Sequence, residues 1–274
     1  MQPKIRLPVL CLTCIVLSMP AGYAASLVEC PVMLKLRQDL HAITTSPDLD
    51  TEHKINAIAA FLDTTPGPHW YLVIDHMQRL DSRIAIDICL SRFRNPESSR
   101  NQKLYLGRHL YNTLRRDGND SGYAENIIAE YRAFIIDAVI NGGAEEFNQP
   151  NRRDTLTAVG EYIRIISDPQ FRSSELHIDE RVIQVLIQCL SASDHVYIES
   201  DLHPPNIRPG EIRAIGDPSG RNRQRERIPL ILAKIKAISA IPALTEIVDD
   251  HHDSYLQKNA KTALEILNKL VDAG

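Results

Sequence analysis

The amino-acid sequence predicts an all-α protein built from stacked antiparallel helix hairpins. Apolar residues recur at intervals of three and four along most of the chain, which is the spacing of one face of an α-helix. Aromatic residues make up only 5% of the 274 residues, so Leu, Ile and Ala must form most of the core. That composition suits helix-on-helix packing better than a β-sandwich. Short connections between the apolar segments place consecutive helices antiparallel.

The first half of the chain contains six of these apolar segments. Each one is closed by residues that interrupt a helix, such as Pro66-Gly67-Pro68 after the second segment and Asn141-Gly142-Gly143 after the sixth. Glycine accepts the left-handed conformation that commonly ends a helix. The predicted helices cover residues 32–43, 55–62, 71–80, 84–93, 104–114 and 123–140.

The second half contains five more apolar segments, separated by one long interruption. They cover residues 156–166, 182–190, 228–238, 241–248 and 254–271. Eleven helices with mostly short connections can stack into an open α-α superhelix or close into a bundle, and periodicity leaves both arrangements open.

The last two predicted helices resemble one HEAT-like, or armadillo-type, helical repeat across residues 235–270. The first of them opens with Ile241-Pro242-Ala243-Leu244, and an acidic turn leads into the second. Proline is tolerated in the first turn of a helix. Ala260 and Ala263 are small enough to let two helices approach closely, although Gln257 stands where the family generally has arginine. The resemblance implies a scaffold that presents a concave surface to partners.

The N-terminal residues have the layout of a secretory signal. Lys4 and Arg6 precede an uncharged run over residues 7–19, and small residues around Ala24 suit cleavage. The run is shorter than the roughly 20 apolar residues that span a bilayer. The sequence therefore predicts a signal peptide over residues 1–24, a single helical domain over residues 25–274, and a periplasmic or secreted protein without stable membrane insertion.

The interruption at residues 191–227 is the strongest candidate for a functional segment, because long loops inside helical arrays are usually functional or disordered. It is rich in carboxylates and histidines, and it ends in alternating arginines that could grip a carboxylate or phosphate. A solvated entry to the next helix is the competing interpretation. The residues predicted to contact a partner are His195, His203, Arg221, Arg223 and Arg225.

Other motifs carry weaker indications. Residues 117–122 imitate the start of a calcium loop, but Ile128 stands where the bidentate glutamate belongs, so a plain turn is favoured. Cys30, Cys89 and Cys189 remain after signal removal, and buried free thiols are favoured over a disulfide for the last two. The sequence predicts no metal site and no cofactor.

The functional prediction is an exported helical-repeat scaffold that binds a protein partner. A formal net charge of −4 gives no support for binding nucleic acid. Phosphate-binding and hydrolase motifs are missing from the sequence, and no catalytic residue is assigned. The alternative is an exported helical hydrolase or lyase that uses carboxylates and histidines of residues 191–227 as acid and base.

Overall fold

The structure is a computed structural model in which residues 31–65, 67–117, 121–148, 156–168, 179–191, 221–250 and 254–272 are described. Every regular element in these ranges is a helix, which confirms the all-α prediction. No helix among the described residues has the length and apolar character needed to cross a membrane.

The N-terminal half follows the predicted order closely. Its helices are α3 (Pro31–Thr45), α4 (Thr51–Ala59), α5 (Phe61–Thr64), α6 (Trp70–Leu80), α7 (Ser82–Arg94), α8 (Arg100–Asp117) and α9 (Ser121–Ile140), with a 3-10 turn η2 (Gly67–His69) before α6. Asp50 and Asp81 explain two of the starts, because their carboxylates accept hydrogen bonds from the backbone N–H groups of His53 and Ile84. Helix α9 ends where predicted, and Gly142 just beyond it has a φ of +112°.

The C-terminal half contains α10 (Gly143–Asn148), α11 (Ala158–Ser167), α12 (Glu180–Leu190), α13 (Arg221–Lys234), η4 (Ile238–Ala240), α14 (Ile241–Asp250) and α15 (Ser254–Asp272). Helix α10 was not predicted, since six residues are too short to show a periodic stripe. Helix α13 begins at Arg221, so the predicted loop over residues 191–227 is wrong in its last seven residues. Those residues are mostly Arg, Gln and Glu, which form helices well but carry no apolar signal.

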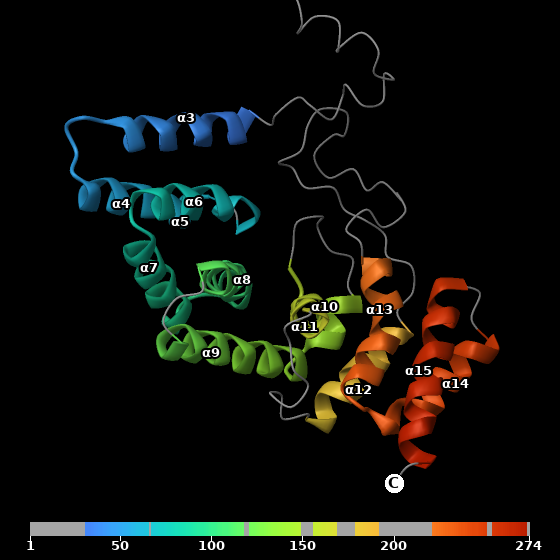
Figure 1. The fold of residues 1–274 in the computed structure, drawn as a ribbon. Coiled ribbons are helices and arrows are strands. Elements are labelled where there is room, and N and C mark those ends of the chain that lie inside the picture. The colour runs from blue at the N-terminus through green and yellow to red at the C-terminus, as the bar shows by residue number, and fades with distance from the viewer. Residues whose placement is uncertain are drawn as a thin grey trace, which may run out of the picture.

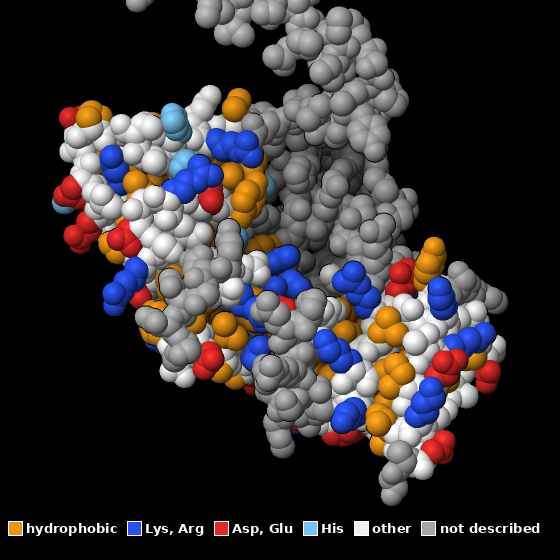
Figure 2. All heavy atoms as spheres, viewed as in Figure 1, with side chains coloured by type: hydrophobic (Ala, Val, Ile, Leu, Met, Phe, Trp, Pro, Cys, Tyr) orange, Lys and Arg blue, Asp and Glu red, His pale blue; other side chains and the backbone are white. Residues whose placement is uncertain are grey.

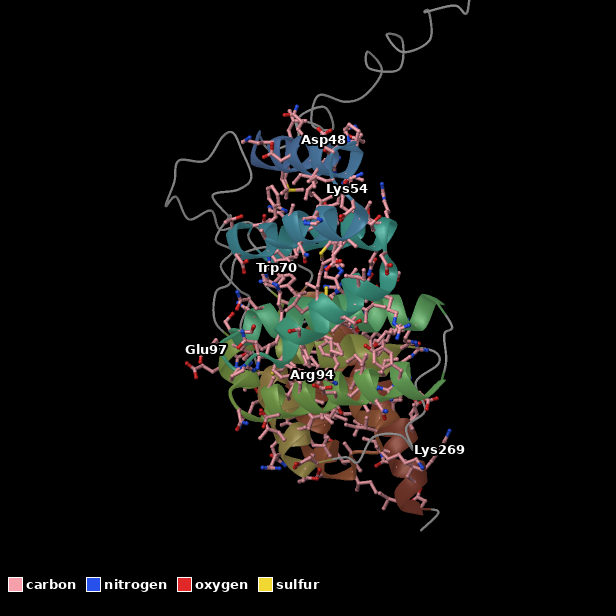
Figure 3. The ribbon with its side chains drawn as sticks, turned by 90° about the vertical axis from the view of Figure 1, so that its left-hand side faces the viewer. Asp48, Lys54, Trp70, Arg94, Glu97 and Lys269 are labelled. Carbon is pink, nitrogen blue, oxygen red and sulfur yellow. The ribbon has the colours of Figure 1, made fainter. Side chains whose placement is uncertain are left out.

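The helices contact their neighbours along the chain and form an elongated array. Extensive contacts join α6 to α7, α7 to α8, α8 to α9 and α14 to α15. Helix α13 packs on α11 and α15, and α9 also packs on α11 and α12. Figure 1 shows the array bending, with α8, α11 and α13 on the inner side of the bend and α9 and α12 on the outer side. In Figure 3, Asp48 and Lys269 lie near opposite ends of the array. The described helices are therefore stacked in chain order, as in a helical-repeat protein.

The C-terminal hairpin packs through the face of α15 that carries the small residues Ala260 and Ala263. Leu256, Ala260, Ala263 and Leu267 of α15 are fully buried, and α15 contacts both α13 and α14. The small alanines bring these helices close together. Leu264, on the edge of this face, is only partly buried.

A tight turn ends α13 with Lys236 in the left-handed region, at a φ of 57°. The backbone N–H of Ala237 donates to the Leu232 carbonyl at 2.9 Å and that of Lys236 to the Ala233 carbonyl at 3.0 Å, the pattern that usually contains glycine. We expect Lys236→Gly to raise the free energy of unfolding by about 0.5–1 kcal/mol, because glycine enters this conformation without Cβ strain. Urea denaturation checks this against Lys236→Ala, which keeps the strain and should not stabilise.

Two cysteines are buried free thiols, as predicted. Cys89 of α7 and Cys189 of α12 form no disulfide, and burial raises the pKa of each thiol to about 12. Cys30 lies outside the described residues. Because the thiolate is the reactive form, we expect Cys89 and Cys189 to resist iodoacetamide in the native protein and to react once urea unfolds it. Peptide mass spectrometry measures both states, and rapid native labelling of either thiol would contradict the burial.

Candidate functional site

Positive charge is concentrated on the inner helices of the array. Helices α8 and α13 each carry five basic residues and one acidic residue, in a chain whose net charge is −4. Helix α9 carries three acidic residues and one basic residue, and α10 carries two acidic residues and none that are basic. In Figure 2, Lys and Arg side chains gather across the middle of the visible face, where Figure 1 places α8, α11 and α13. The inner helices are thus rich in basic residues although the whole protein is acidic.

Two short stripes bring the charged groups of this face together. On α8, Arg108, Tyr111 and Arg115 are spaced by three and four residues and so share one side of the helix. On and just beyond α11, Glu161, Arg164 and Asp168 have the same spacing. Helices α8 and α11 are in contact, and both pack against α9. We call the resulting group the Arg–Tyr cluster: Arg108, Tyr111, Asn112, Arg115, Tyr131, Glu161, Arg164 and Asp168.

Glu161 is the buried centre of the Arg–Tyr cluster, with only 4% of its side chain exposed. Its Oε2 accepts hydrogen bonds from Arg164 Nε at 2.9 Å and from the Tyr131 hydroxyl at 3.0 Å. Its Oε1 lies 3.6 Å from Arg108 Nη1. A carboxylate buried this deeply requires such compensation, so Glu161 holds α8, α9 and α11 to one another through charge and hydrogen bonding.

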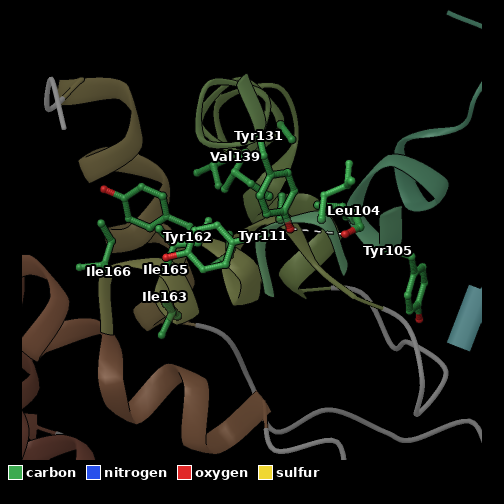
Figure 4. Packing of buried hydrophobic residues seen from close by; sticks show 14 of the residues in the cluster. Leu104, Tyr105, Tyr111, Tyr131, Val139, Tyr162, Ile163, Ile165 and Ile166 are labelled. Carbon is green, nitrogen blue, oxygen red and sulfur yellow. Dashed lines mark hydrogen bonds between the residues drawn. The ribbon is translucent and has the colours of Figure 1, made fainter. Parts of the chain in front are cut away.

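Close packing of α9 against α8 lets Tyr131 reach Glu161. A Cβ atom at Gly107 of α8 would collide with the Tyr131 ring, so this position has room only for glycine as the helices are packed. Burial raises the pKa of the Tyr131 hydroxyl well above its ordinary value, and the negative charge of Glu161 adds to the effect. Figure 4 shows Tyr131 and Tyr111 among the buried residues, with the Tyr131 hydroxyl directed at the backbone oxygen of Leu104. Tyr131 therefore remains a neutral donor to Glu161.

Two guanidinium groups lie close to the ring of Tyr111. The carbon at the centre of the Arg164 guanidinium lies 5.0 Å from the centre of the Tyr111 ring, and that of Arg115 lies 5.4 Å from it. Both distances fit cation–π contacts. The Tyr111 hydroxyl donates to Asp168 Oδ2 at 3.1 Å and accepts from Arg115 Nη1 at 2.9 Å. The ring and Asp168 therefore fix the positions of the arginines at the junction of α8 and α11.

Arg108 is the arginine of the cluster with the most available donors. Among the described residues its guanidinium pairs with the Glu161 oxygen 3.6 Å away, which is beyond hydrogen-bond distance, and 39% of its side chain is exposed. Asn112 lies one helical turn further along α8 and is exposed. Its Oδ1 accepts from Arg164 Nη1 at 3.2 Å, which leaves its Nδ2 group as a donor. Arg108 and Asn112 therefore present free N–H groups on the same side of α8.

His109, beside Arg108, makes the stability of the folded protein depend on pH. Burial lowers the pKa of its imidazole from 6.5 to about 4, and the charge of Arg108 contributes. Between these two values the unfolded chain binds more protons than the folded protein, so stability falls as the pH falls from about 6.5 towards 4. We expect His109→Gln to reduce the loss of unfolding free energy between about pH 7.5 and pH 5 by about 1–2 kcal/mol. Urea denaturation at both pH values measures this, and His41→Gln, at an exposed position on α3, is the matched control.

The Arg–Tyr cluster includes none of the five residues that were predicted to contact a partner. His195 and His203 are outside the described residues, as are residues 118–120 of the calcium-like segment that was interpreted as a plain turn. Arg221 and Arg223 belong to the first turn of α13, but their side chains are not among those described. Arg225 is buried, with 7% exposed, so it packs inside the array. Residues 192–220 lie outside the described residues, so the structure tests neither the predicted partner contacts nor the hydrolase alternative in that segment.

The Arg–Tyr cluster itself was missed by sequence reasoning. The only available signal was the spacing of Arg108, Tyr111 and Arg115, which overlaps the leucine stripe that identified α8 as a helix. No group of His, Cys, Asp and Glu residues in the described ranges is arranged to hold a metal ion. Glu161 and Asp168 are both ion-paired with arginines, an arrangement that favours anchoring over proton transfer.

Comparisons with known proteins add no assignment: no protein-family model, no curated protein and no solved structure matches the chain.

Proposed function

We propose that the protein is an exported helical-repeat scaffold that binds an acidic protein partner on the inner face of its bend, at α8, α11 and α13. The observation that carries this proposal is the charge distribution: two helices rich in arginine flank α11 in a protein of net negative charge. Such a patch attracts and orients an anionic surface more strongly than the net charge would predict.

The architecture supports a binding scaffold. Helices stacked in chain order leave long surfaces along both sides of the array, and repeat proteins use the concave one for recognition. The C-terminal hairpin, with Pro242 in the first turn of α14 and paired alanines in α15, supports a HEAT-like repeat. The lysine, arginine and apolar run near the N-terminus support export to the periplasm or the exterior.

Site-specific photo-cross-linking in the native host tests this proposal. Asn101 lies two turns before Arg108 on the same side of the inner helix α8, and Asn126 lies on the outer helix α9. Both are exposed, so each can be replaced in turn by a photoreactive amino acid. We expect a discrete cross-linked protein of acidic composition from position 101 and none of the same identity from position 126. Identical products at both positions, or no protein product at position 101, would contradict a partner on the inner face.

The same experiment reports the compartment. Cross-linked products from an exported scaffold should contain periplasmic or secreted proteins, identified by mass spectrometry. Cytoplasmic products on a chain that retains Met1 would contradict the export prediction while leaving the binding face untouched.

A further inference from the structure

We infer that Arg108 and Asn112 form an oxyanion site for an acidic side chain of the partner, held in place by Glu161 and Arg164. This inference rests on the proposed function and names the chemistry by which the inner face recognises its partner. No residue of the site is taken from the predicted loop at residues 191–220.

The donors of this site are arranged for a planar anion. The Arg108 guanidinium offers a fork of N–H groups, which matches the two oxygens of a carboxylate. The Nδ2 group of Asn112 lies one turn along the same side of α8 and offers a further donor. Because arginine only donates, the oxygen of the Asn112 amide must face Arg164, and its nitrogen must face away from that arginine.

Buried neighbours hold the donors of the site in place, which reduces the conformational entropy lost on binding. Arg164 is fixed by Glu161 and by the Tyr111 ring, and it in turn fixes the Asn112 amide. Glu161 also attracts Arg108, whose Nη1 atom lies 3.6 Å from its Oε1 atom. This attraction restricts the Arg108 side chain but leaves the N–H groups of Arg108 free to donate to another group. A guanidinium held near a buried carboxylate but not bound to it remains available to a second anion.

The charge of the cluster favours a carboxylate over a phosphate. Arg108 and Arg164 both lie against one acidic residue, Glu161, so this group has one positive charge in excess. A single carboxylate neutralises that excess, whereas a phosphate dianion would leave a negative charge next to buried Glu161. The remaining basic residues of α8 and α13 extend the favourable potential to neighbouring acidic residues of the same segment.

Fluorescence anisotropy with the purified protein and a labelled deca-glutamate peptide tests the site. We expect the peptide to bind and a deca-glutamine peptide not to bind. Arg108→Gln should weaken the dissociation constant by about tenfold or more, since it removes both charge and fork. Arg108→Lys keeps the charge and should weaken binding by about threefold, because the bidentate geometry is lost.

Arg181→Gln is the matched control. Arg181 lies on α12, pairs with Asp179 and is 71% exposed, so its replacement removes the same charge from a different surface. We expect less than about a twofold change for this variant at constant salt. Equal weakening by Arg108→Gln and Arg181→Gln would show diffuse attraction and overturn the site. Circular dichroism of each variant confirms that it is folded.

Two further outcomes also overturn the inference. If deca-glutamate does not bind the wild type while cross-linking at position 101 identifies an inner-face partner, the oxyanion site is wrong and the proposed function stands. If inorganic phosphate displaces the peptide but acetate at equal ionic strength does not, the site takes phosphate and the assignment of a carboxylate is wrong. Peptide binding that depends on Arg108, without any cross-linked protein at position 101, would instead leave the site intact and contradict the proposed function.

Discussion

Replacement of Glu161 by alanine is expected to lower the free energy of unfolding by about 3–5 kcal/mol. The carboxylate is buried and accepts hydrogen bonds from Arg164 and Tyr131 while attracting Arg108. Its removal leaves the partly buried Arg164 guanidinium without its main counter-charge, and it takes from the Tyr131 hydroxyl an acceptor that is closer than the Leu104 carbonyl. Urea denaturation followed by circular dichroism measures the change.

The matched control for this variant is Glu130→Ala. Glu130 of α9 also forms an ion pair with an arginine, since Arg94 Nη2 lies 2.7 Å from its Oε2, but both side chains are substantially exposed. Exposed ion pairs contribute about 0–1 kcal/mol, so this variant should be close to the wild type in stability. Similar losses for Glu130→Ala and Glu161→Ala would mean that burial does not set the energetic importance of Glu161.

Replacement of Leu267 by alanine is expected to lower the free energy of unfolding by about 2–5 kcal/mol. Leu267 is fully buried in α15, which packs against both α13 and α14. The substitution removes apolar contacts and leaves a cavity that the neighbouring helices can only partly close. Urea denaturation again measures the loss.

Two variants of α15 calibrate that result. Leu264→Ala should cost less than Leu267→Ala, because Leu264 is partly exposed at the edge of the buried face. Lys261→Ala, on the solvent-exposed side, should change stability by no more than about 0.5 kcal/mol. Equal effects at Leu267 and Lys261 would contradict the packing of the C-terminal hairpin, and with it the main support for a HEAT-like repeat.

Helices with a long apolar stripe could be predicted from the sequence, whereas polar or short ones could not. Helix α15 was recognised with its buried face because Leu256, Ala260, Ala263 and Leu267 repeat every three or four residues. Helix α10 is too short to show a stripe, and the first turns of α13 carry charged residues where a stripe would be apolar. In both places the sequence lacks the apolar stripe from which a helix is predicted.

The Arg–Tyr cluster could not be predicted, because its geometry depends on contacts between residues distant in sequence. Arg108 and Glu161 are brought together by the packing of α8 and α11, which no local pattern reveals. Tyr131 reaches the same carboxylate only because Gly107 admits its ring. A single sequence shows which residues share a helix face, but it does not show which faces meet.

The chain-order stacking of the helices has a consequence for how the protein folds and comes apart. The principal contacts join helices that are near one another in the sequence, so little loop-closure entropy opposes their formation and folding should be fast for a chain of this length. Opening of α14 and α15 removes contacts mainly from α13, and α3 has its own contacts with α4 and α6. Amide hydrogen exchange should therefore be quickest at the two ends and slowest around Glu161, so that the centre of the array outlasts its ends.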